Sequence, residues 1–162
     1  SKRGNPAHHK IGEDAKMNEE LAKAAAQQEM IRQMMQDYLN ELKQENAQGV
    51  GGNNKALKQM EDTEKDIVNK RINNQTIQRQ NEILTRMLES ERAEKKKGRD
   101  NERKSTVGVD VIQKNNQNIE AFNKLKNREL ELFRKIPPIY SSYYKAKVNE
   151  YFYNFETQNK KH

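Results

Sequence analysis

A heptad pattern in the first third of the chain constrains its fold more than any other feature. Consecutive members of the pattern lie alternately four and three residues apart: Met17, Leu21, Ala24, Gln28, Ile31, Met35, Tyr38 and Leu42. This is the a/d spacing of a coiled coil, with Gln28 as its one polar interruption. No glycine or proline lies between residues 13 and 48. The pattern predicts a helix over 14–47, roughly 50 Å long at about 1.5 Å per residue.

The composition limits how much core such a helix can share. Only 32% of the chain is hydrophobic and 34% is charged, and there is no tryptophan. A globular domain of this length usually has more apolar side chain to bury. Either the chain is disordered or it forms long helices that each bury one narrow stripe, and the periodicity favours helices.

Turn residues divide the rest of the first hundred residues. The glycine-rich run 49–52 precedes Asn53-Asn54, which predicts a loop and then a second helix over 54–71. The apolar spacing loses phase at Asn73-Asn74. A turn there gives a third helix over 75–97 and a three-helix bundle over 14–97. A straight helix there gives a hairpin with one long arm, and both interpretations stay open.

The remaining segments complete an all-α prediction. Residues 1–13 are expected to be a flexible tail and 98–110 a charged linker. Residues 111–159 are expected to be a helical pair broken at Pro137-Pro138, because proline restricts the residue before it and suits a first helical turn. The predicted architecture is an elongated helical bundle or hairpin with coiled-coil-like packing, plus a C-terminal helix–Pro-Pro–helix corner.

The aromatic residues cluster beyond that corner. Seven of the ten lie between Tyr140 and Phe155. A helix folded back at the prolines would turn four side chains inward: Tyr144, Val148, Tyr151 and Phe155. Four rings are left as candidates for contact with a partner: Tyr140, Tyr143, Phe152 and Tyr153. Internal packing of these rings is the more ordinary interpretation, because large rings bury much apolar area.

Residues that could carry catalysis form no recognisable constellation. The three histidines lie near the chain ends, at His8, His9 and His162, and there is no cysteine. The carboxylates, including those over 89–94, are interpreted as solvated helix surface, with none isolated on an apolar face. No nucleophile elbow or phosphate-binding loop is present. The sequence therefore predicts no enzyme, no catalytic residue, no metal, no cofactor and no small-molecule substrate.

A basic patch supplies the alternative function. It comprises Lys95, Lys96, Lys97, Arg99, Arg103 and Lys104, in a chain of net charge +7. Such a patch can hold phosphates, but acidic neighbours dilute it and no aromatic side chain within it could stack on a base. Nucleic-acid binding therefore ranks below binding to a protein partner or self-association. An anionic membrane surface stays open as a further partner.

Three runs resemble one known family. They are QEMIRQMMQDYL at 28–39, MEDTEKDIVNKR through RQNEILTRMLESERAE at 60–94, and ELELFRKIPPIYSSYYKAKVNEYF at 129–152. They are similar to the C-terminal coiled-coil region of a domain-of-unknown-function family of very large, membrane-anchored bacterial envelope proteins. The resemblance brings no known activity.

The chain's departures from this family lie at the Asn-rich stretch 115–118 and in the added rings Tyr153 and Phe155. The heptad pattern over 14–47, the missing catalytic constellation and the resemblance together predict a non-catalytic structural or protein-interaction module that acts through helix–helix contacts. It would be a soluble part of a membrane-anchored protein of the cell envelope. The sequence does not fix the side of the membrane, and the periplasm is slightly favoured.

Overall fold

The computed structural model describes residues 6–44, 51–104 and 106–160. Within these residues the chain forms four helices: α1 (Pro6–Gln44), α2 (Gly51–Val68), α3 (Asn74–Arg103) and α4 (Val109–Asn159). No strand occurs in these ranges. The all-α prediction is therefore confirmed.

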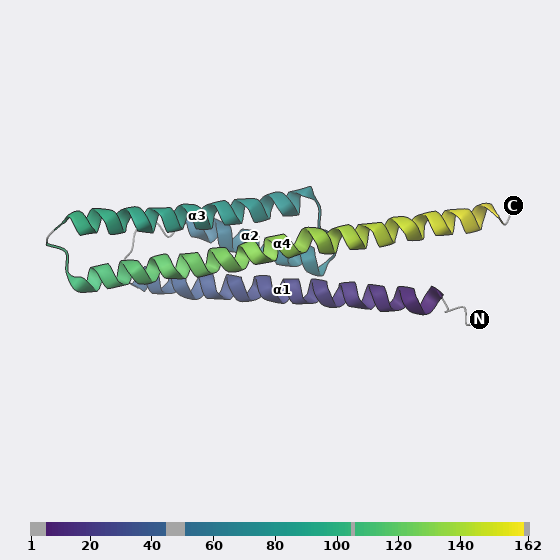
Figure 1. Ribbon diagram of the computed structural model, residues 1–162, viewed down its shortest axis with the longest axis horizontal. Coiled ribbons are helices and arrows are strands. Elements are labelled where there is room, and N and C mark those ends of the chain that lie inside the picture. The colour runs from purple at the N-terminus through teal and green to yellow at the C-terminus, as the bar shows by residue number, and fades with distance from the viewer. Residues whose placement is uncertain (1–5, 45–50, 105, 161–162) are drawn as a thin grey trace.

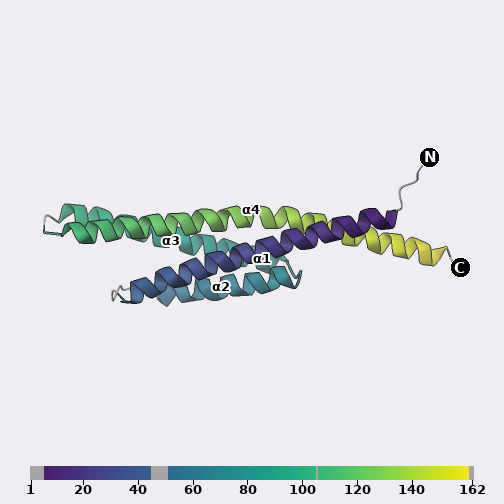
Figure 2. The same cartoon turned by 90° about the horizontal axis from the view of Figure 1, so that it is seen from below.

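The four helices pack as one elongated bundle. α1 packs on α2, α2 on α3, α3 on α4 and α4 back on α1, so α1 and α3 lie on one diagonal and α2 and α4 on the other. Successive helices run in opposite directions, as Figures 1 and 2 show. The prediction of a three-helix unit with a separate C-terminal pair was wrong. The first half of α4 is the fourth helix, because Leu125, Leu132 and Ile136 lie in the common core.

The predicted turn at Asn73-Asn74 is confirmed, and local hydrogen bonds explain both of its ends. Lys70 adopts φ 56°, where the left-handed conformation lets the Lys70 and Arg71 amides donate to the carbonyls of Ile67 and Asp66. Asn73 then caps α3: its side chain accepts from the Thr76 amide, and the Thr76 hydroxyl accepts from the Asn73 amide. The chain therefore forms a bundle rather than a hairpin with one long arm.

Two segments expected to be irregular are largely helical. α1 begins at Pro6, inside the predicted tail, because proline fits the first turn of a helix. α3 continues to Arg103, so the predicted linker shortens to residues 104–108. Gly98 lies within this extension and faces α4. A Cβ atom at Gly98 would lie 2.4 Å from Asn115 Oδ1. Glycine at 98 therefore allows the close approach of α3 to α4.

The hydrophobic core runs along the axis of the bundle. α1 contributes more of its side chains than any other helix, and Met60, Ile67, Ile83 and Met87 enter from α2 and α3. Its members on α1 and α4 are Leu21, Ala24, Ala25, Ile31, Met35, Leu39, Leu42, Leu125, Leu132 and Ile136. The heptad residue Tyr38 stacks edge-on against Phe122 of α4, with ring centroids 4.9 Å apart.

The expected corner at Pro137-Pro138 was wrong, because α4 continues through both prolines. Neither view shows the chain folding back at this point (Figures 1 and 2). Leu132, Ile136 and Ile139 keep a same-face helical spacing across the prolines; the first two are fully buried and the third packs against the core. Each such burial stabilises by about 1.5–3 kcal/mol, against a cost of about 3 kcal/mol for a proline inside a helix.

A fold-back at the prolines therefore does not occur. The side chains predicted to face inward after the fold-back lie outside the described set: Tyr144, Val148, Tyr151 and Phe155. In Figure 1 the C-terminal part of α4 instead projects beyond α2 and α3, at the same end of the bundle as the start of α1.

Replacing both prolines by alanine should stabilise the protein. Pro137→Ala together with Pro138→Ala restores two backbone N–H donors inside α4, so the free energy of unfolding should rise by roughly 3 kcal/mol or more. Urea unfolding followed by circular dichroism measures this change. Pro6→Ala, at the start of α1, is the matched control and should change little. A double variant that loses helix content would show that the prolines hold a break in the chain.

Candidate functional site

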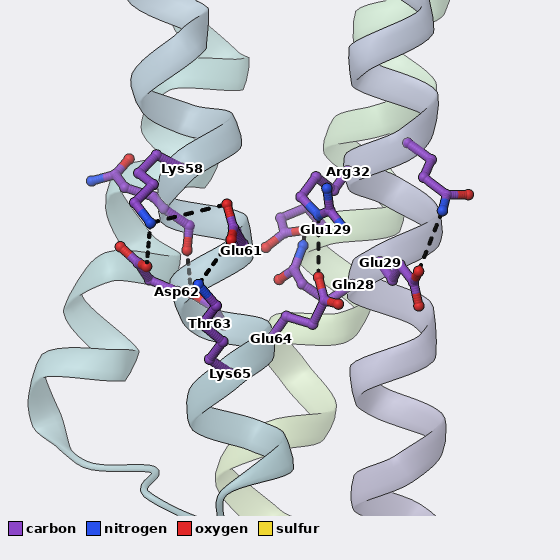
Figure 3. A network of polar contacts seen from close by, with 12 residues as sticks. Gln28, Glu29, Arg32, Lys58, Glu61, Asp62, Thr63, Glu64, Lys65 and Glu129 are labelled. Carbon is purple, nitrogen blue, oxygen red and sulfur yellow. Dashed lines mark hydrogen bonds and ion pairs between the residues drawn. The ribbon is translucent and has the colours of Figure 1, made fainter.

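Polar side chains join the neighbouring helices along the partly covered seams of the bundle. Between α1 and α2, Arg32 Nε lies 3.2 Å from Glu64 Oε2 (Figure 3). Between α2 and α3, Arg79 Nη1 lies 2.7 Å from Asp66 Oδ2, and the Thr76 hydroxyl donates to the same oxygen at 2.9 Å. These side chains are mostly covered, so their ion pairs are less screened than exposed ones. They fix which residues of adjacent helices stand side by side.

Glu91 performs this role between α3 and α4. Its carboxylate accepts hydrogen bonds from Asn123 Nδ2 at 3.0 Å and from the Lys126 ammonium, and Lys95 Nζ lies 3.1 Å away. The hydrogen bonds from Asn123 and Lys126 lower the pKa of Glu91 to about 2, against the opposing effect of burial. Glu91 is 1% exposed, so its interpretation as solvated surface was wrong.

Glu129 joins α4 to α1 in the middle of the bundle. Its side chain is fully buried, and its Oε2 accepts a hydrogen bond of 2.8 Å from Nε2 of the equally buried Gln28 (Figure 3). Burial raises the pKa of Glu129 to about 7, and the Gln28 hydrogen bond opposes this only in part. The expectation that no acidic residue stands isolated on an apolar face was therefore wrong.

Two further polar residues are buried close to this level. Thr63 of α2 donates its hydroxyl to the Gln59 carbonyl of its own helix at 2.8 Å. Gln80 of α3 is fully buried, and within the described ranges neither polar atom of its amide has a hydrogen-bond partner. Gln59 bonds to Glu82 and Asp66 pairs with Arg79, and this antiparallel register places Thr63 opposite Gln80. Each of the four helices thus contributes a buried polar side chain near the middle of the core.

The basic patch is only partly a single surface. With 3.6 residues per turn, Lys95, Lys96, Arg99 and Arg103 share one exposed face of α3, together with Arg92, which the sequence reasoning missed. Lys97 lies on a different face, and Lys104 follows the last helical residue. Lys95 forms an ion pair with Glu91. The structure therefore brings together four of the six predicted residues.

The predicted aromatic surface is described at two of its four residues. Phe152 is 58% exposed and Tyr153 is 65% exposed, both on the projecting part of α4. The side chains of Tyr140 and Tyr143 lie outside the described set. At the opposite end, where α3 and α4 meet, Val109, Val111 and Ile112 are exposed apolar side chains. Sequence reasoning missed this second surface, because three β-branched residues at a helix start give no distinctive pattern.

The grooves in the described part of the protein lie between neighbouring helices. A groove between α2 and α3 is lined by polar residues such as Gln59 and Glu82, and another between α1 and α4 by Ala24, Pro138 and Ile139 among others. Neither includes Glu91 or Glu129. Within the described ranges, no cluster of three histidine or acidic side chains is arranged to hold a metal ion. None of the helical segments described is apolar enough over a sufficient length to cross a membrane.

Comparisons with known proteins return no relative. No protein-family model, no curated protein and no solved structure matches the chain. The resemblance to the large envelope proteins therefore rests on the three quoted runs alone.

Removing the charge of Glu91 should destabilise the protein at neutral pH. Glu91→Gln leaves Lys126 without its anionic partner, so the free energy of unfolding should fall by about 1–3 kcal/mol. Because the folded-state pKa is depressed to about 2 from 4.5, this stabilisation is present above pH 4.5 and is lost as the pH falls through about 2. Urea unfolding at pH 7 and in this acidic range measures the difference.

Glu89→Gln is the matched control, since Glu89 is exposed on the same helix and should change stability by less than about 0.5 kcal/mol. Equal losses in the two variants would contradict a specific role for Glu91.

Proposed function

We propose that the chain is a non-catalytic structural or protein-interaction module that acts through helix–helix contacts. The observation that supports this is the projection of α1 and α4 beyond α2 and α3 (Figure 1), with Phe152 and Tyr153 exposed on α4. A helix that extends past its own bundle offers its sides to another helix. Exposed aromatic side chains are the type most often found at the energetic centre of such contacts.

We further propose that the module belongs to a membrane-anchored protein of the bacterial envelope. The family resemblance supports this, since the family's members carry membrane helices ahead of a long helical and coiled-coil region. A bundle with a narrow core, in a chain of which 34% is charged, suits a soluble segment of such a protein. Detection of the full-length protein in washed membranes, and its release only by detergent, would test the proposal. Recovery in the soluble fraction would contradict it.

The interaction proposal predicts a contact that depends on the aromatic pair. Phe152→Ala with Tyr153→Ala should weaken self-association, or binding to a protein partner, by about 30- to 900-fold, because aromatic contact residues each contribute on the order of 1–2 kcal/mol. Light scattering over a concentration series tests self-association. Comparative capture from a lysate, with wild type and variant as baits, tests for a partner whose binding the variant loses.

A variant at the opposite end of the bundle provides the control. Val109→Ala with Ile112→Ala removes exposed apolar atoms of comparable kind and should leave the contact unchanged. Circular dichroism checks that both variants keep their helix content. A strictly monomeric wild type at about 100 μM, well above the dissociation constants of specific interfaces, with no captured protein that the aromatic variant loses, would contradict the proposal.

A second candidate function, binding to nucleic acid, is favoured by the shared face of Arg92, Lys95, Lys96, Arg99 and Arg103 on α3. Replacing Lys96, Arg99 and Arg103 with glutamine should weaken binding to a fluorescent oligonucleotide and lower its salt dependence, because fewer counterions are released. Lys97→Gln, on another face, is compared with the single variant Lys96→Gln, since each removes one positive charge. Absence of binding at low salt would eliminate this function.

A further inference from the structure

The contact between Gln28 and Glu129 is incomplete. Nε2 of Gln28 donates to Oε2 of Glu129 at 2.8 Å, but the oxygens Gln28 Oε1 and Glu129 Oε1 have no hydrogen-bond partner among the residues that the structure describes. Both side chains are fully buried. A buried polar atom without a partner has lost its hydrogen bonds to water and gained none in return, which is unfavourable. Two such atoms therefore lie on the two side chains that join α1 to α4.

One proton can satisfy both atoms. An amide oxygen and an ionised carboxylate only accept hydrogen bonds, so the two unpaired oxygens cannot bond to each other. A protonated carboxyl group carries an O–H donor. With the proton on Glu129 Oε1, this O–H can donate to Gln28 Oε1 while Gln28 Nε2 still donates to Glu129 Oε2. The acid and the amide then form two hydrogen bonds in opposite directions.

The charged groups of the adjoining elements are engaged elsewhere. Arg32 of α1 pairs with Glu64 of α2. Arg79 of α3 pairs with Asp66 of α2, and Lys126 of α4 bonds to Glu91.

The other buried polar side chains near this level are neutral. Thr63 donates its hydroxyl to its own helix, and Gln80 is a buried amide. In the described part of the protein, burial is thus opposed at Glu129 only by the Gln28 hydrogen bond, and the pKa of this carboxyl rises to about 7.

We propose that Gln28 and Glu129 form a proton-dependent latch between α1 and α4. The latch is closed when Glu129 is protonated and makes both hydrogen bonds to Gln28. It loosens when Glu129 ionises, because a buried carboxylate without a cation then retains a single hydrogen bond. The contact lies in the seam between α1 and α4, and the same two helices continue into the projecting ends, so loosening it affects the seam on which these ends depend.

The direction of the pH dependence follows from the raised pKa. The carboxyl has a pKa of 4.5 when unperturbed and about 7 in the folded protein. The folded state therefore binds the proton more tightly than the unfolded state. The stabilisation is complete below pH 4.5, declines as the pH rises above this value, and is lost above about pH 7. The stabilisation from Glu91 is instead lost as the pH falls, and at lower pH values, so the effects of the two carboxyls on stability can be measured separately.

Nuclear magnetic resonance tests the proton itself. The side-chain carboxyl carbon of Glu129, assigned by its loss in Glu129→Gln, should titrate near pH 7 in the folded wild-type protein. A midpoint at or below about pH 5, typical of an unperturbed carboxyl, would overturn the proposal. The variant is needed only to assign the signal, and the titration itself is measured on the wild-type protein.

Unfolding equilibria test the coupling to stability. Between pH 5 and pH 8 the unfolding constant of wild type, divided by that of Glu129→Gln, should rise roughly 50- to 100-fold, as expected for a single group with these two pKa values. The ratio cancels the titration of the histidines, which both proteins share. Glu131→Gln, at an exposed position on α4, should retain the wild-type dependence. A ratio independent of pH would overturn the latch.

A distance measurement tests whether α1 loosens from α4 when Glu129 ionises. The chain has no native cysteine, so spin labels can be attached specifically at Lys23→Cys on α1 and Lys135→Cys on α4, which line one groove between these helices. The distance distribution should broaden from pH 5 to pH 8, and Glu129→Gln should abolish the broadening. A distribution unchanged over this range would show that ionisation does not loosen α1 from α4.

Discussion

A buried polar side chain costs free energy unless it finds a hydrogen-bond partner, and this bundle cannot avoid burying them. Only 32% of the chain is hydrophobic, so four helices enclose a core that includes Gln28, Thr63, Gln80 and Glu129. Much of the structure follows from this constraint. The seams carry paired carboxylates, cations and amides, and the pairs occur where one helix must stay in register with the next.

These pairs specify the arrangement more than they stabilise it. Replacing a buried ion pair with well-packed apolar side chains is often neutral or favourable for stability. A sliding movement of α3 against α4 would, however, strand Glu91 away from Lys126 and Asn123, and a similar slip of α2 would separate Asp66 from Arg79. Apolar stripes alone tolerate such slips. We infer that the polar residues select one register for a bundle whose apolar contacts are sparse.

The sequence predicted the helical class, the stripe of α1 and the turn at Asn73, because each depends on local spacing or capping. It did not predict how α4 passes Pro137 and Pro138. The local preference of proline for a break loses to the burial of Ile136 and Ile139, which is a tertiary effect. Glu91 and Glu129 were also missed. The signal for Glu129 was present, since it lies between Leu125 and Leu132 on the buried stripe. An acidic residue at such a position, however, suggests that the apolar spacing has shifted and that the position is exposed.

Apolar spacing predicts the buried face of α3 only in part. Its core face carries Thr76, Gln80 and Glu91 beside Ile83 and Met87, so hydrophobicity marks only part of the face. Leu84 and Leu88, which a search for apolar residues would choose, are half-buried at its edge. Which polar side chains of α3 point inward depends on the partners that α2 and α4 offer them.

The antiparallel packing of α1 on α4 has a mechanical consequence. Pro6 and Asn159, the ends of these helices, lie at the same end of the bundle (Figure 1). Tension applied between them would not stretch the bundle along its length. It would peel α1 from α4 in the geometry of a zipper, where contacts break in sequence and each bears the force in turn. Such a seam resists peeling one contact at a time, whereas a pull along the helix axes would load many of its contacts together.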